Sequence, residues 1–363
     1  MNLAIYGAQG YALGTYEAIK TLYPKREVAC FLVTHMDGNP PVLSGIPVKE
    51  LTLFSEETSE EEKRHTEVLI ATPEKAHSDI EETLENYGFR CHRRLTYERR
   101  RELMQLYYAR LGRFLPLAAL PVGYHMPLVR MYQARSQADK PLMESFVQPP
   151  YVFAIQAGAA RSSVRVADLS DDSGENISEK NGNYCELTAL YWIWKNKLLS
   201  DGVANNEAAQ YFGLCQYRRG FDLKEDDLLR LMDNDVDAVL PYPLPYEPDI
   251  NAHHERYIKE TDWKAVLQAL EELQPEYAAA FPQILGQQYL YNYNLILAKK
   301  NVLREYCEWL FPILFRTEEL SIPKGSLRND RYIGYLGETL ETLYFMKNAD
   351  RLNIVHTECR MLV

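Results

Sequence analysis

Short apolar runs alternate with amphipathic stretches along the whole chain. In the first ninety residues, the apolar runs at 3–6, 28–33 and 68–71 predict buried strands, and the stretches after the first and third runs predict helices. Strands and helices alternating in this order are typical of a small Rossmann-like α/β unit. We therefore predict an N-terminal Rossmann-like domain over residues 1–90, which serves for nucleotide binding or for docking.

A larger α/β pattern follows from about residue 149. Buried strands are predicted at 152–155, in the first half of 211–221, at 238–241 and at 289–298. Helices are predicted at 183–198, 226–232, 263–273, 302–314 and 331–346. We therefore predict a second domain over residues 119–363, and between the two domains a basic helical linker over residues 91–118. The expected fold class is α/β throughout.

Composition agrees with a globular protein of two domains, since the chain has 363 residues, of which 46% are hydrophobic and 25% charged. The net charge of −11 argues against a nucleic-acid partner, which would need a basic face. The six cysteines form no Cys-x-x-Cys pair, which indicates a reduced, cytoplasmic protein. The N-terminus does not have the pattern of a signal peptide, and no apolar run is long enough to span a membrane.

Basic residues are concentrated in the segment 90–114, which also has helical character. One hypothesis is that this segment lies against an anionic membrane surface, where each basic residue contributes about 1 kcal/mol. The protein would then be peripheral to the inner face of the membrane. The alternative is a solvated linker helix. Recovery with neutral and anionic liposomes distinguishes the two.

Three glycines follow the first predicted strand, at Gly7, Gly10 and Gly14. Glycines at the start of a helix permit a tight turn and close backbone approach to a phosphate, so these three are candidate cofactor-binding residues. Their spacing departs from Gly-x-Gly-x-x-Gly, and no acidic residue closes the second strand. The alternative interpretation is a degenerate or docking domain that binds no nucleotide.

Two adjacent arginines, Arg218 and Arg219, follow the apolar residues that begin at Tyr211. The carboxyl end of a buried strand is where an α/β sheet usually opens onto its ligand crevice. A guanidinium group donates two hydrogen bonds at once to phosphate oxygens, so a pair at this position suits a diphosphate. Surface ion pairs are the alternative.

Carboxylates offer two further candidate features. Glu338 lies in the predicted helix 331–346 beside Gly334 and Gly337, where a ligand or a neighbouring helix could approach closely, and it could act as a general base. Asp235-Val236-Asp237 resembles the Asp-x-Asp pair that holds a divalent ion in many glycosyltransferases, but it precedes its strand and is expected at the opposite edge of the sheet. We assign no metal ligands, and a divalent metal ion stays open as a cofactor.

Three separated motifs resemble a known bacterial family. They are Asp171-Asp172-Ser-Gly-Glu-Asn176-Ile-Ser, then Tyr184-Cys-Glu-Leu-Thr-Ala-Leu-Tyr-Trp-Ile-Trp-Lys-Asn196, and then Tyr211-Phe-Gly-Leu-Cys-Gln-Tyr217-Arg218-Arg219. The family was first described as a domain of unknown function from capsular and exopolysaccharide gene clusters, and its members are regarded as glycosyltransferases. The resemblance covers roughly residues 120–363 and includes Gly334-Tyr335-Leu336-Gly337-Glu338. This chain has Gln216 where the family usually has histidine.

The resemblance implies a GT-A-like α/β fold that uses a UDP-sugar, with members associated with galactofuranose transfer. We therefore predict a transferase that moves a sugar from a UDP-sugar to a polysaccharide or lipid-linked oligosaccharide acceptor. The catalytic candidate is Glu338. The donor-binding candidates are Asp171, Asp172, Asn176, Asn196, Tyr217, Arg218 and Arg219.

Two alternatives stay open. One is an NAD-dependent nucleotide-sugar oxidoreductase or epimerase that uses the N-terminal domain. The other is a catalytically decayed scaffold of polysaccharide assembly, which the glutamine at 216 and the imperfect glycine pattern suggest. Calorimetry with UDP, UDP-sugars and NAD distinguishes the three.

Overall fold

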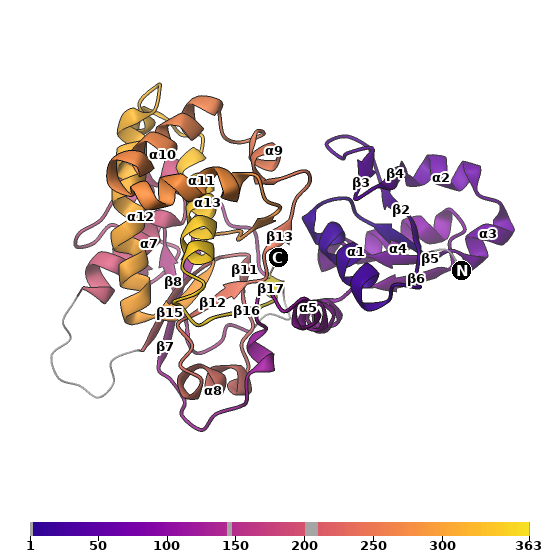
Figure 1. The fold of residues 1–363 in the computed structure, drawn as a ribbon, viewed down its shortest axis with the longest axis horizontal. Coiled ribbons are helices and arrows are strands. Elements are labelled where there is room, and N and C mark those ends of the chain that lie inside the picture. The colour runs from indigo at the N-terminus through magenta and orange to yellow at the C-terminus, as the bar shows by residue number, and fades with distance from the viewer. Residues whose placement is uncertain (1–2, 144–146, 200–209, 363) are drawn as a thin grey trace. The chain divides into compact units, whose positions relative to one another are not determined.

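The computed structural model describes residues 3–143, 147–199 and 210–362, and the chain forms two compact units (Figure 1). The first unit extends to Arg113 and includes the later segment Leu244–Glu247. The second unit comprises Phe114–Pro243 and the chain from Pro248 on. The predicted boundaries at 90 and 118 thus differ from the boundary at Arg113.

Six strands form the sheet of the first unit, in the order β3-β4-β2-β1-β5-β6, and all neighbours except β3 and β4 pair in parallel. Its elements are β1 (Leu3–Tyr6), α1 (Gly10–Leu22), β2 (Val28–Val33), β3 (Val42–Leu43), β4 (Ile46–Glu50), α2 (Leu51–Glu57), α3 (Glu60–His65), β5 (Glu67–Ile70), α4 (His77–Asn86), β6 (Cys91–Arg94), α5 (Tyr97–Leu111) and the late strand β13 (Leu244–Pro245). The basic segment therefore supplies the last parallel strand and a helix packed on α1, instead of a separate linker.

The second unit has a larger mixed sheet, in the order β16-β12-β15-β10-β7-β8-β9. Its strands are β7 (Val129–Arg135), β8 (Val152–Gln156), β9 (Leu169–Ser170), β10 (Tyr211–Gln216), β11 (Arg219–Phe221), β12 (Ala238–Pro241), β14 (Tyr289–Leu290), β15 (Ile296–Lys299), β16 (Ile354–Thr357) and β17 (Cys359–Met361). Its helices are α6 (Asn181–Tyr184), α7 (Leu187–Ile193), α8 (Glu225–Asp233), α9 (Ile250–His254), α10 (Glu260–Leu273), α11 (Pro275–Leu285), α12 (Lys300–Leu320) and α13 (Tyr332–Lys347). Both units confirm the predicted α/β class.

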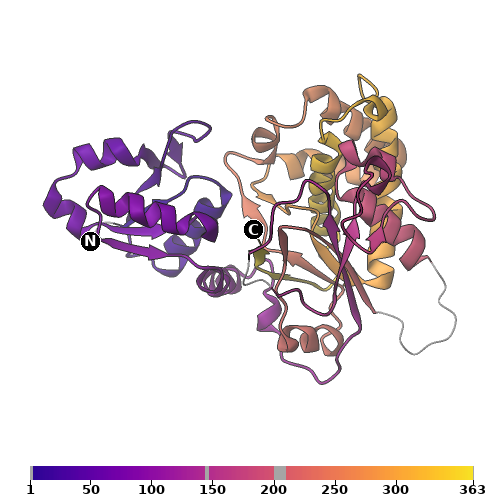
Figure 2. The ribbon, with the colours of Figure 1, turned by 180° about the vertical axis from the view of Figure 1, so that it is seen from behind.

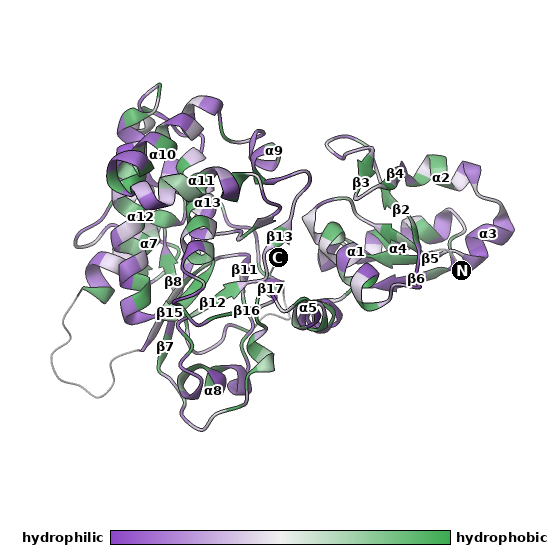
Figure 3. Ribbon diagram, in the orientation of Figure 1, coloured by the Kyte–Doolittle hydropathy of each residue, from purple (hydrophilic) through white to green (hydrophobic). Residues whose placement is uncertain are grey.

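Strand β10 lies near the middle of this sheet, parallel to β7 and antiparallel to β15. Its side chains alternate between two buried clusters, as the period of a strand requires. Phe212 and Leu214 join the helical layer that contains α7 and α10 to α13, whereas Tyr211 and Cys215 join the cluster beside α8. Figures 1 and 2 show the strands and helices of this unit from two sides, and Figure 3 shows hydrophobic residues along the strands.

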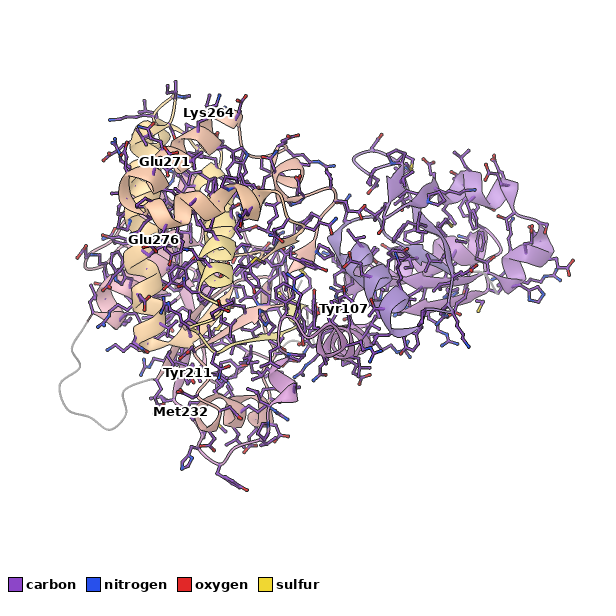
Figure 4. All side chains as sticks on the ribbon, in the orientation of Figure 1. Tyr107, Tyr211, Met232, Lys264, Glu271 and Glu276 are labelled. Atoms are coloured by element: carbon purple, nitrogen blue, oxygen red, sulfur yellow. The ribbon has the colours of Figure 1, made fainter. Side chains whose placement is uncertain are left out.

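The helices that cover the sheet are amphipathic, because only one face of each contacts the core. Trp263, Val266 and Leu270 of α10 are buried. Lys264 and Glu271 of the same helix, which are labelled in Figure 4, are exposed.

Two predicted elements are interrupted. The predicted strand 289–298 is divided into β14 and β15, because Tyr293 and Asn294 both have positive φ angles, of 79° and 47°. The predicted helix 183–198 is divided at Cys185, which has a φ angle of 52°. Positive φ is uncommon for residues other than glycine and often marks a functional region. Both interruptions lie next to the cavity described below.

Candidate functional site

A tight hairpin places the predicted arginines. Gln216 at the end of β10 pairs with Arg219 at the start of β11, so Tyr217 and Arg218 form the two-residue turn between the strands. The turn lies at the carboxyl ends of the parallel strands β7 and β10. This is the edge at which open α/β sheets bind ligands.

A cavity of about 420 Å³ opens at this edge, beyond the ends of β7, β8 and β10. Its volume suits a small-molecule ligand. The lining residues come from all three strand ends, from α6 and its surroundings, and from the start of α13: Ala134, Arg135, Ser136, Ala138, Asp139, Ala157, Asn181, Gly182, Cys185, Glu186, Gln216, Tyr217, Arg218, Asn329 and Arg331.

Three arginines line the cavity, but their charges are balanced differently. The Arg135 guanidinium donates to the Asp139 carboxylate over 3.0 Å, so its charge is compensated within the cavity wall. Arg218 lies 5.9 Å from the ring of Tyr217, and Arg331 donates to the Cys185 sulfur over 3.3 Å. Among the residues that the structure describes, neither Arg218 nor Arg331 forms an ion pair with a carboxylate. These two guanidinium groups are therefore available to an anionic ligand.

Arg219 has a different environment from its neighbour Arg218. Its guanidinium lies 4.0 Å from the centre of the Tyr293 ring and donates to the Gln216 amide oxygen over 3.4 Å. It does not belong to the cavity lining, whereas Tyr217 and Arg218 do. The turn thus separates the two guanidinium groups that the sequence predicts as a pair, and Arg331 takes the place of the second cation in the cavity.

Glu186 connects the cavity to the interrupted strand. Its carboxylate accepts hydrogen bonds from the side chains of Gln216 and Asn294, both over 2.9 Å. Asn294 also donates to the carbonyl of Gly334 in α13 over 3.2 Å. Gln216, the position at which the chain departs from the family pattern, therefore orients a carboxylate in the cavity wall.

Glu338 is half-buried on α13 and lies behind this network. Burial raises the pKa of its carboxyl group to about 8, and the nearby Glu186 carboxylate adds to the increase. Hydrogen bonding from the Tyr293 backbone, the charge of Arg219 and the Asn292 amide at 3.5 Å oppose it. A carboxyl group with a pKa near the working pH suits proton transfer. Glu338 does not itself line the cavity.

The glycines beside Glu338 have a packing role. A Cβ atom on Gly337 would lie 2.7 Å from Leu187 and 2.8 Å from the amide oxygen of Asn294, and one on Gly334 would lie 3.0 Å from the Cys185 sulfur. Close approach of the α7 region to α13 therefore requires both glycines. The sequence leaves two explanations for these glycines, which are close approach of a ligand and close approach of a neighbouring helix. The contacts in the structure support the second explanation.

The first acidic candidates hold their own loop together. Asp171 is fully buried and accepts hydrogen bonds from the backbone of Gly158 and Ala159 and from the Ser178 hydroxyl, over 2.8, 3.0 and 2.5 Å. Asp172 forms an ion pair with Arg165. Neither aspartate is in the cavity lining. Direct contact with a donor thus stays a prediction for both, while the structure shows how Asp171 fixes the turn that follows β8.

Asn176 and Asn196 likewise make local contacts. Asn176 accepts from the Ser178 backbone over 3.2 Å and donates to the Gly174 carbonyl over 3.0 Å. Asn196 donates to the carbonyl of Glu175 over 2.8 Å, which ties this loop to the helix. Both lie outside the cavity lining, so their predicted role as donor contacts also stays a prediction.

The N-terminal glycines are explained by contacts inside the first unit. A Cβ atom on Gly10 would lie 3.0 Å from the carbonyl of Pro245, and one on Gly14 would lie 3.4 Å from the Pro245 ring. Gly7 has a φ angle of 121° and faces the carbonyl of Ala71. Pro245 belongs to the segment Leu244–Glu247, which occupies the space in front of α1. The three glycines therefore permit close packing here, and their predicted cofactor contact has no support from this geometry.

Potential metal ligands are dispersed over the described part of the chain. Residues 3–143, 147–199 and 210–362 bring no three His, Cys, Asp or Glu side chains into a metal-binding group. Asp237 of the Asp-x-Asp pair binds the Lys299 ammonium group over 2.8 Å, at the amino end of β12 and thus at the edge opposite the cavity.

No helix in the same described ranges is long and apolar enough to cross a membrane.

Cys185, Glu186 and Arg331 are cavity residues that are not among the predicted site residues. Cys185 and Glu186 lie in the second family motif. The apolar residues of that motif predict a helix packed on the core, and this pattern does not indicate a role for its polar residues. Arg331 is the first residue of the predicted helix 331–346 and directly precedes the observed α13. Its position depends on the packing of α13 against the α6 region, which lies far away in the sequence.

Together the fold and the cavity define an α/β protein whose candidate ligand site lies at the carboxyl ends of parallel strands. The family described as "Domain of unknown function (DUF4422)" matches residues 140–349, which is more than half of the chain, and the chain belongs to this family. This confirms the predicted resemblance at the level of the family. The GT-A-like and Rossmann-like assignments stay predictions.

Among solved structures, the chain is similar to the apo structure of WbbM, a bifunctional glycosyltransferase, with a TM-score of 0.53 and 26% sequence identity. The similarity covers 64% of this chain and 45% of that chain, so this chain spans less than half the length of WbbM. A comparison with curated proteins finds no match.

Proposed function

We propose that this protein is a glycosyltransferase that moves a sugar from a UDP-sugar to a saccharide or lipid-linked acceptor in the cytoplasm. The observation that carries the proposal is the cavity at the carboxyl ends of β7, β8 and β10, with Arg218 and Arg331 in its wall. Family membership and the similarity to a bifunctional glycosyltransferase support it. The resemblance to galactofuranose-associated proteins makes UDP-galactofuranose one donor to test.

In this proposal Arg218 and Arg331 bind the diphosphate. Each guanidinium group can donate two hydrogen bonds to phosphate oxygens. As the bond between the sugar and the diphosphate breaks, negative charge develops on the leaving group, and fixed cations stabilise it. Tyr217, beside Arg218 at the hairpin tip, contacts the donor in the same cavity. A divalent metal ion could share this role, and no step here depends on one.

Glu338 acts as the general base in the proposal. It takes the proton from an acceptor hydroxyl as that oxygen attacks the anomeric carbon, and the diphosphate leaves with the bonding electron pair. The raised pKa means that Glu338 is largely protonated at neutral pH in the free protein. The active, ionised fraction should therefore increase as pH rises towards and past 8.

The test is calorimetric titration with UDP, UDP-galactose, UDP-galactofuranose and NAD. We expect UDP and at least one UDP-sugar to bind. Arg218→Ala should weaken UDP binding by about ten- to a hundredfold, because a hydrogen bond to a charged group contributes roughly 1.5–3 kcal/mol. Arg64→Ala, which removes the same charge from the exposed face of α3, is the matched control and should leave UDP affinity unchanged.

Other outcomes would identify the alternatives. Binding of NAD without UDP would favour the oxidoreductase or epimerase. The geometry gives no support to that alternative, since the chain itself fills the space in front of Gly10 and Gly14. No binding of any of these ligands would favour the scaffold and contradict the proposed transferase.

A further inference from the structure

Two tyrosine rings stack on each other close to the cavity rim. The rings of Tyr257 and Tyr335 have centroids 4.8 Å apart and are inclined by 25°. Tyr257 is 45% exposed, and Tyr335 is partly exposed on α13. The neighbouring His253 ring meets Tyr257 edge to face at 6.0 Å, which holds Tyr257 in position. We call this stacked and partly exposed pair the tyrosine platform.

The platform adjoins the cavity through Arg331, although neither ring is part of the cavity lining. The Arg331 guanidinium, which lines the cavity, lies 5.9 Å from the centre of the Tyr335 ring. Tyr335 stands four residues after Arg331 and three before Glu338, so these side chains follow one another along one face of the chain. Burial raises the pKa of Tyr335, and the positive charge of Arg331 opposes this increase.

Tyrosine rings suit sugars for a simple chemical reason. The C–H groups on one face of a pyranose or furanose ring make an apolar surface that packs flat on an aromatic ring, while a tyrosine hydroxyl can hydrogen-bond at the ring edge. The Tyr257 side chain, which is 45% exposed and stacks on Tyr335, is available for such a contact.

We propose that Tyr257 and Tyr335 form the acceptor subsite, on which a sugar ring of a saccharide acceptor stacks. This inference rests on the proposed transferase function and deepens it. It assigns the acceptor to the α13 side of the cavity and leaves the donor on the side of β7 and β8.

The position of Glu338 favours the acceptor over the donor base as the occupant. An acceptor hydroxyl must lie beside the general base, and Tyr335 is three residues from Glu338 on the same helix. The cavity residues that follow β7 and β8, among them Ser136, Asp139 and Ala157, lie directly beyond the strand ends, where nucleotides bind in open α/β sheets.

The experiment is saturation-transfer NMR on the full chain in the presence of saturating UDP. The probes are methyl glycosides of galactopyranose, galactofuranose, glucopyranose, mannopyranose and N-acetylglucosamine. We expect at least one glycoside to receive saturation from the wild-type protein. Tyr257→Ala should reduce that signal about fivefold or more, whereas Tyr257→Phe should retain it because the ring is kept.

Two further variants keep the result interpretable. Tyr124→Ala removes a tyrosine that is 93% exposed and lies outside the cavity lining, and it should have no effect. Tyr257→Leu keeps apolar bulk for packing against Tyr335 but lacks the aromatic face, so it should lose the signal even if Tyr257→Ala fails to fold. Thermal unfolding of each variant shows whether it is folded.

Three results would overturn the acceptor subsite. They are no saturation of any glycoside by the wild-type protein, an unchanged signal in both Tyr257→Ala and Tyr257→Leu, or a loss of UDP affinity in these variants with glycoside binding intact. The last result would assign the rings to the nucleotide base. UDP binding that depends on Arg218 would survive the first two results, so failure of the platform is distinguishable from failure of the proposed function.

Discussion

Adjacent residues can serve different sites when a tight turn separates them. Arg218 lies at the tip of the β10–β11 hairpin and lines the cavity, whereas Arg219 returns into β11 and stacks on Tyr293. The two arginines therefore have different surroundings. Arg218 shares the cavity wall with the distant Arg331, whereas the charge of Arg219 acts on the Glu338 carboxyl group.

At this scale we predict that activity depends on the ionisation of Glu338. The rate constant kcat/KM should rise with pH and level off above an apparent pKa near 8, because the base must be deprotonated. Glu338→Gln should reduce kcat by about a hundredfold or more and remove this dependence. The measurement is a pH profile with the donor identified by calorimetry. A flat profile in the wild type would contradict the assigned base.

The stability of the protein should depend on the same group. The pKa of Glu338 is raised from 4.5 to about 8 on folding, so between these values the folded state binds more protons than the unfolded state. The stabilising contribution of this group is complete below pH 4.5 and is lost as pH rises through 8. Glu338→Gln should therefore gain stability relative to wild type as pH increases through this window. Urea unfolding at pH 5, 7 and 9 measures the difference, and a constant difference would contradict the raised pKa.

Arg219 should tune the base without binding the donor. Its positive charge opposes the increase in the pKa of Glu338. Arg219→Gln should therefore shift the pH profile to higher pH and leave UDP affinity close to that of wild type, while Arg219→Lys should keep the profile. A loss of UDP affinity equal to that of Arg218→Ala would show instead that both arginines bind the diphosphate.

At the scale of elements, α13 and the broken segments around it border the candidate site. α13 carries Glu338 and begins beside Arg331, and it packs against the α6 region through glycines. The strand break at Tyr293 and Asn294 turns the Asn294 amide towards Glu186. Regular secondary structure would not bring these polar groups together, which is a physical reason for strained backbone at the site.

Helix packing at Gly337 yields a test of this arrangement. Gly337→Ala should destabilise the protein by about 1–3 kcal/mol, because the new methyl group overpacks against Leu187 and Asn294. The matched control is Gly286→Ala at the end of α11, where a Cβ atom would meet only the Pro282 carbonyl at 3.4 Å. That change should be nearly neutral. Denaturant unfolding measures both, and equal effects would contradict the packing explanation.

At the scale of the whole molecule, the distribution of charge bears on the membrane hypothesis. The chain has a net charge of −11, and several basic residues of segment 90–114 have partners inside the first unit. Arg94 pairs with Glu81, Arg93 lies 3.5 Å from Glu67, and Arg100 is buried against the ring of Tyr11. Cations that are already paired or buried contribute little to binding an anionic surface.

We therefore expect equal recovery of the protein with neutral and with phosphatidylserine-containing liposomes at physiological salt. Co-sedimentation measures this directly. Preferential recovery with the anionic liposomes that Arg90→Glu and Arg99→Glu abolish would contradict the expectation and restore the peripheral membrane contact.

The sequence alone determined the α/β class, most strand and helix positions, the family, and Tyr217, Arg218 and Glu338 as site candidates. These follow from periodicity and from motifs, because burial of one face imposes a local pattern on the residues. Tertiary structure alone decided that Arg331, Cys185 and Glu186 join the cavity, that Arg219 leaves it, and that Asp171 is a buried anchor. Such contacts join segments far apart in the chain, and a local pattern carries no information about which distant side chain will meet it.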